Sequence, residues 1–67
     1  MKITDTEMRI LADYMNWELR EELHSELAPC SNEKFIMEYL KRDPEFEMIL
    51  KERDHTDVID LYCLIYR

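Results

Sequence analysis

Four glutamates in the first half of the chain have a spacing that could support binding. Glu18, Glu22 and Glu26 recur every four residues, and Glu21 lies beside them. On a helix, residues four apart share a face and lie about 6 Å from one another. Such a row of carboxylates could dock on lysines and arginines of a partner, as nucleic-acid phosphates do. An ordinary solvated helix face would have the same pattern.

A second group of acidic residues lies in the other half of the chain. It is interrupted by Lys51 and Arg53. Its members are Asp43, Glu45, Glu47, Glu52, Asp54, Asp57 and Asp60. If the fold places both groups on one side of the molecule, the case for an anionic docking surface becomes much stronger.

Metal-binding and catalytic residue types are present, but their spacing is wrong. His24, Cys30, His55 and Cys63 would suffice in number for a tetrahedral zinc site. No Cys-x-x-Cys or His-x-x-x-His pair occurs. Cys30 with either histidine could resemble a thiol catalyst, but the chain contains no glycine and so no glycine-rich oxyanion or phosphate loop. We therefore expect no metal, no cofactor and no enzymatic activity.

The charge of the chain restricts its partners. Sixteen acidic residues and nine basic ones give a formal net charge of -7 in 67 residues. This charge repels nucleic acids and anionic membranes, and it attracts basic protein surfaces. We expect a protein partner and no direct nucleic-acid binding.

The sequence also bears on location. The longest apolar run, 61–66, is far shorter than the roughly 20 residues that cross a bilayer. The chain does not open with the pattern of a signal peptide. We expect a cytoplasmic protein that has free thiols and does not enter the membrane.

Helices joined by short loops should position these side chains, because glycine is absent and only two prolines occur. Thr4 and Glu7 have the spacing of a capping box, which predicts a helix starting at Asp5. Asn16 can cap a second helix, although a single helix could also run through it. Pro29 should end that stretch.

A third and a fourth helix follow. Ser31 is a suitable N-cap for a helix that ends near Arg42, and Asp43 followed by Pro44 should stop it and start the next, with Pro44 in the first helical position. The positions expected to face the core share the helical period. They are Met8, Leu11, Ala12, Met15, Leu19, Leu23, Leu27, Phe35, Ile36, Tyr39, Leu40, Phe46, Ile49 and Leu50.

The last segment, 56–67, admits two interpretations. Val58, Leu61, Tyr62 and Ile65 have helical spacing, but the β-branched and aromatic content also suits a strand. As a helix it would be apolar nearly all round, which is typical of a central helix or one that meets another chain. The predicted fold is an all-α compact bundle of four to five short helices, forming a single domain over 1–67.

Two stretches resemble known sequences. The runs 24–35, HSELAPCSNEKF, and 39–46, YLKRDPEF, resemble short uncharacterised proteins from phage and mobile-element regions of Gram-positive bacteria. The resemblance covers residues 4–50 and rests on capping and core residues. It implies a mobile-element setting and assigns no activity and no functional residues.

Our leading functional hypothesis is a small interaction module that docks on a basic, nucleic-acid-handling protein and inhibits or modulates it. Glu18, Glu21, Glu22 and Glu26 would supply the charge, and Trp17 would supply apolar contact. The alternative is a self-associating structural or regulatory module, a homodimer formed through the apolar carboxyl-terminal segment. The residues of that interface would be Tyr62, Leu64 and Tyr66.

Overall fold

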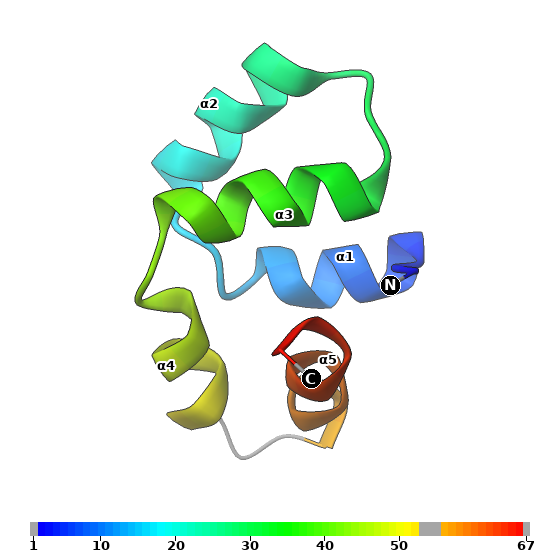
Figure 1. Cartoon of the computed structure of the whole chain (residues 1–67), viewed down its shortest axis with the longest axis vertical. Coiled ribbons are helices and arrows are strands. Elements are labelled where there is room, and N and C mark those ends of the chain that lie inside the picture. Colours follow the sequence, from blue (N-terminus) through cyan, green and yellow to red (C-terminus); the bar gives the residue numbers. More distant parts are fainter. Residues whose placement is uncertain (1, 53–55, 67) are drawn as a thin grey trace.

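Five α-helices and no strand make up the part of the chain that the structure describes, residues 2–52 and 56–66 of a computed structural model (Figure 1). The helices are α1 (Asp5–Ala12), α2 (Trp17–Leu27), α3 (Asn32–Arg42), α4 (Phe46–Glu52) and α5 (Thr56–Tyr66). The predicted all-α bundle of short helices is confirmed.

Side-chain caps set the starts of the first three helices. The Thr4 hydroxyl accepts a hydrogen bond from the backbone N–H of Glu7 at 3.2 Å, and the Glu7 carboxylate accepts one from the N–H of Thr4 at 2.8 Å. Asn16 and Ser31 each accept a hydrogen bond from the backbone N–H three residues later. Capping satisfies N–H groups that have no partner within the helix. The predicted capping box and the break at Asn16 are therefore confirmed.

The fourth helix starts later than its sequence predicts. The helix begins at Phe46, whereas Pro44 was expected in its first position. The Asp43 carboxylate accepts a hydrogen bond from the Tyr39 hydroxyl at 2.6 Å, and the Asp43 carbonyl accepts one from the N–H of Phe46 at 3.2 Å. The expected cap is thus engaged with the preceding helix, and Pro44 lies in a turn.

The last segment is helical, which resolves the alternative left open by its composition. Val58 and Leu61 are buried, and α5 packs against both α1 and α4 (Figure 1). These two contacts bury most of its apolar surface within the chain itself. Ile59 is the exception, because its side chain is 49% exposed.

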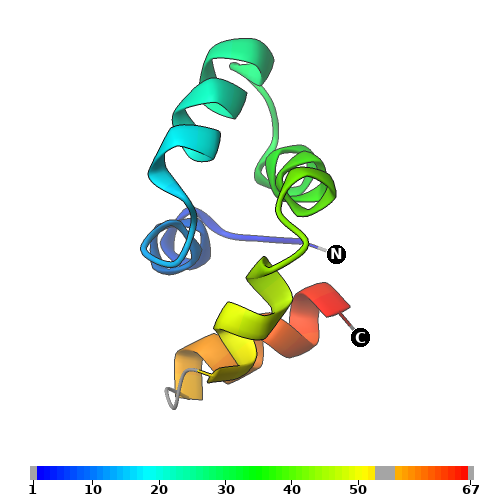
Figure 2. The same cartoon turned by 90° about the vertical axis from the view of Figure 1, so that its left-hand side faces the viewer.

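The core runs along the length of the molecule. α2 packs on α3 at one end of the longest axis, α4 and α5 lie at the other end, and α1 and α3 lie between them (Figures 1 and 2). The Tyr39 and Phe46 rings meet edge to face, 5.2 Å apart. The buried apolar residues are Ile3, Leu11, Met15, Leu23, Phe35, Ile36, Tyr39, Phe46, Leu50, Val58 and Leu61. Other predicted core positions, among them Met8, Ala12 and Leu19, are only partly buried.

Candidate functional site

The glutamates of α2 form an exposed surface that we call the acidic face, consisting of Glu18, Glu21, Glu22 and Glu26. Leu23, on the opposite side of the same helix, is fully buried. Because α2 packs on α3 through its inner side, Glu18, Glu21 and Glu22 lie on its outer side, and Glu26 lies on the flank that borders α3. The structure therefore brings the predicted acidic residues together at one end of the molecule.

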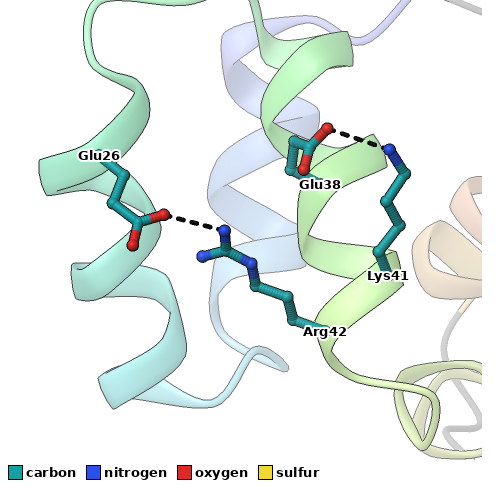
Figure 3. Close-up of polar contacts among 4 residues, drawn as sticks. All are labelled: Glu26, Glu38, Lys41 and Arg42. Atoms are coloured by element: carbon teal, nitrogen blue, oxygen red, sulfur yellow. Dashed lines mark hydrogen bonds and ion pairs between the residues drawn. The ribbon is translucent and has the colours of Figure 1, made fainter.

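Glu26 differs from the other three glutamates. Its carboxylate pairs with the Arg42 guanidinium of α3 at 2.9 Å (Figure 3). Within residues 2–52 and 56–66, no ion pair involves Glu18, Glu21 or Glu22. The unneutralised charge of the acidic face therefore lies toward the amino-terminal half of α2.

A further ion pair lies on α3, outside the acidic face. The Lys41 ammonium contacts the Glu38 carboxylate at 3.1 Å, three residues earlier on the helix (Figure 3). Exposed pairs of this kind contribute about 0–1 kcal/mol to stability. This pair leaves the charge of α2 unchanged.

Trp17 is the first residue of α2 and is 66% exposed. Glu21 follows it by one helical turn, so the indole lies at the edge of the acidic face. Its neighbour Met15 is buried, and Tyr14 is partly buried. Large exposed aromatic side chains are frequent anchors of protein interfaces. Of the three residues at this helix junction, Trp17 is thus the one available for contact.

The second acidic group does not join the acidic face. Its members on α4 and α5 lie at the far end of the longest axis from α2 (Figure 1). Asp43 is the exception, because the Tyr39 hydroxyl links its carboxylate to the N–H of Asn16, the cap of α2. The carboxylate of Glu47 contacts the Lys51 ammonium at 3.4 Å and accepts a hydrogen bond from the Tyr62 hydroxyl at 3.0 Å. Asp54 and the side chain of Asp57 lie outside the described residues.

The predicted dimer residues, Tyr62, Leu64 and Tyr66, are all partly buried against the core. The rings of Tyr62 and Tyr66 lie 5.1 Å apart, with the Lys51 ammonium 5.6 Å from the centre of the Tyr62 ring. Leu64 lies about 200° round the helix from Tyr62, at 100° per residue, and packs against the core. Burial and the acidic neighbour Glu47 raise the pKa of Tyr66 to about 12. Self-association through these residues stays a prediction.

The candidate metal ligands are scattered. In the described part of the chain, no three His, Cys, Asp or Glu side chains are grouped so that they could hold a metal ion. Cys30 and Cys63 are partly buried free thiols, and the His24 ring meets the Phe35 ring edge on at 6.4 Å. His55 lies outside the described residues. No described helix has the length and apolarity that a membrane span requires.

The structure also contains a groove that sequence reasoning missed. It has a volume of about 520 Å³ and lies between α1, α2 and the segment 28–30 that leads into α3. Met8 and Ala12 line it from α1, and Arg20 and His24 line it from α2. Their spacing of four places each pair on one helix face, which was the only signal in the sequence.

A comparison of the sequence with known protein families assigns the chain to one of them. The sequence model of the family described as anti-CRISPR protein AcrIC5 matches residues 4–45, well over half of the chain. This protein belongs to the AcrIC5 anti-CRISPR family. No curated protein and no solved structure matches the chain.

Membership of the AcrIC5 family bears on the earlier predictions. The matched residues comprise α1, α2 and α3, and so include the whole acidic face and Trp17. An anti-CRISPR family agrees with the predicted phage setting and with an inhibitor that acts on a protein partner. The basic character of that partner and the residues that contact it belong to the proposal below.

Proposed function

We propose that this AcrIC5-family protein inhibits a CRISPR effector by docking the acidic face of α2 on a basic, nucleic-acid-handling surface of that effector. The observation that carries the proposal is the exposed row Glu18, Glu21 and Glu22, which has no ion pair within the described residues and lies in the part of the chain that matches the family. Exposed carboxylates that lack internal partners are available to lysines and arginines of another protein.

The physics of this docking is competition for positive charge. Effector surfaces that hold phosphates present Lys and Arg side chains, and a row of carboxylates about 6 Å apart can occupy them. The net charge of -7 would speed the encounter by electrostatic attraction. Trp17, exposed at the edge of the acidic face, supplies apolar contact. Inhibition then requires occupancy alone, without catalysis or a cofactor, and takes place in the cytoplasm.

The first experiment measures binding of the protein to purified CRISPR effector complexes at about 0.1 M and about 1 M salt, between which the Debye length falls from about 10 Å to about 3 Å. We expect the affinity to fall steeply and excess nucleic-acid target to compete with the inhibitor. An affinity that stays constant across this range would contradict acidic docking.

A pair of triple variants separates the acidic face from overall charge. One variant carries Glu18→Gln, Glu21→Gln and Glu22→Gln. The control variant carries Glu45→Gln, Glu52→Gln and Asp60→Asn, which are exposed residues outside α2. Both variants remove three negative charges. We expect the first to weaken binding about tenfold or more, from about 0.5–1 kcal/mol per lost pair, and the control to retain most of the affinity. Equal losses would contradict a localised site.

A further inference from the structure

The groove between α1 and α2 contains none of the glutamates of the acidic face. Its volume of about 520 Å³ lies within the range of roughly 300–1,000 Å³ that is usual for ligand pockets. Met8, Ala12 and Met15 give it an apolar wall from the first helix and its exit, and Phe35 of α3 completes that wall. A space of this size and lining suits a short peptide segment that inserts a large apolar side chain.

Positive charge lines this groove, in a protein that is otherwise acidic. Arg9 is exposed and makes no ion pair among the described residues. Arg20 donates one hydrogen bond from Nη1 to the Ala12 carbonyl at 3.4 Å, which leaves its other N–H groups available. Asp5 is the one carboxylate in the lining, and it accepts a hydrogen bond from the Asn32 amide at 2.9 Å. The lining therefore carries two guanidinium groups and a single carboxylate, which is already engaged.

We infer that this groove binds a segment of the protein partner in which a large apolar side chain is adjacent to a carboxylate. The apolar side chain fills the space between Met8 and Phe35, and the carboxylate pairs with the guanidinium groups of Arg9 and Arg20. Arginine suits this role because its planar N–H groups match the two oxygens of a carboxylate.

The position of the groove favours a protein segment as its occupant. Arg20 and His24 lie on one flank of α2, and Glu21 of the acidic face lies between them in sequence, on the adjacent surface. A partner docked on the acidic face would therefore lie next to the groove. The identity of the occupant thus rests on the proposed function. Two adjacent surfaces of opposite charge would also fix a single orientation of the partner, because a rotated complex would pair like charges.

A peptide experiment tests the groove without the effector. The probes are acetyl-Leu-Phe-Glu-Glu-amide and acetyl-Leu-Phe-Lys-Lys-amide, and the readout is the rate at which a thiol reagent modifies Cys30, which lines the groove. Cys63 of α5 is the internal control. We expect the acidic peptide to slow modification of Cys30 several-fold and to leave Cys63 unchanged. The net charge of -7 favours the basic peptide everywhere else. Equal protection by both peptides, or protection by neither at millimolar concentration, would overturn the inference.

A pair of charge reversals tests the same groove in the complex with a purified CRISPR effector. Arg9→Glu and Lys34→Glu change the net charge equally, and both residues are exposed, but Lys34 lies outside the groove. Acidic docking alone predicts that neither substitution weakens binding to a basic surface. The groove predicts that Arg9→Glu weakens binding about tenfold, because a charge-assisted hydrogen bond is lost, while Lys34→Glu does not weaken it.

The outcomes of the charge reversals separate the two proposals. Equal, unweakened binding by both variants, with the dependence on salt and on the acidic face intact, overturns the groove and leaves the proposed function standing. Loss of that dependence overturns the proposed function, and the peptide experiment still decides whether the groove binds an acidic, apolar segment.

Discussion

The hydroxyl of Tyr39 donates a hydrogen bond to the Asp43 carboxylate at 2.6 Å, one helical turn later on α3. The same hydroxyl accepts a hydrogen bond from the backbone N–H of Asn16 at 2.7 Å. Tyr39 is fully buried, so its single polar atom joins the end of α3 to the residue that caps α2. This contact fixes the start of the helix that carries the acidic face.

Replacement of Tyr39 by Phe should therefore destabilise the fold. The change leaves the Asn16 N–H and the Asp43 carboxylate without their partner, which costs about 1–3 kcal/mol. The free energy of unfolding from urea denaturation measures this. Tyr62→Phe is the matched control, because Tyr62 is only partly buried and its hydroxyl makes one hydrogen bond, to Glu47, so the loss should cost less. Equal losses in the two variants would contradict the role given to Tyr39.

Alkaline pH should destabilise the protein through its tyrosines. Folding raises the pKa of Tyr66 from 10.0 to about 12, mainly by burial, and burial together with the hydrogen bond to Asp43 raises the pKa of Tyr39. Between pH 10 and 12 the unfolded chain has lost these protons and the folded chain retains them. The free energy of unfolding therefore falls as the pH rises through this range. Urea titrations at successive pH values measure the slope, which Tyr66→Phe should reduce. An unchanged slope would show that Tyr66 makes no contribution.

Leu23 should be a position of high sensitivity. It is fully buried on the inner side of α2, and Leu→Ala changes in cores cost about 2–5 kcal/mol. A domain of this length has only about 3–10 kcal/mol of total stability. We expect Leu23→Ala to lower the thermal midpoint sharply in circular dichroism. Met37→Ala, on the half-exposed surface of α3, should change it little. A mild effect at Leu23 would mean that α2 is not held by its inner side.

Trp17 should report docking directly. It is the only tryptophan in the chain and is 66% exposed, so the free protein should have the red-shifted emission of a solvated indole. If 5-fluorotryptophan is incorporated into the inhibitor and fluorine NMR is the readout, the unlabelled effector gives no signal. The resonance of Trp17 should then report its burial on binding. Trp17→Ala should weaken binding by at least 1 kcal/mol, about fivefold, without loss of thermal stability. An indole that stays solvated in the complex would exclude it from the interface.

Much of the fold could be predicted because the signals were local. Thr4, Asn16 and Ser31 each cap a helix by bonding to a backbone N–H three residues away, a contact that requires no knowledge of the rest of the chain. The outward position of the acidic face also followed from the helical period, since Leu23 points inward between its glutamates.

The start of α4 and the form of the last segment could not be predicted, because both depend on contacts with other helices. Asp43 was expected to cap α4, but its carboxylate bonds to Tyr39 of α3, and the fourth helix starts two residues after Pro44. The alternative of a strand for the last segment was removed only by the packing of α5 on α1 and α4. Local propensity could not decide between two backbone forms that suit the same β-branched and aromatic residues.

By itself, then, the sequence determined the helices, their capped starts, the excess of negative charge and the row of glutamates on one side of α2, because these depend on neighbours within a few residues. The tertiary structure alone decided that Glu26 pairs with Arg42, that α4 and α5 carry most of the second acidic group to the far end, and that Arg9 and Arg20 line one apolar groove. Each of these brings together residues from different helices, and the relative placement of helices is set by how their apolar faces pack.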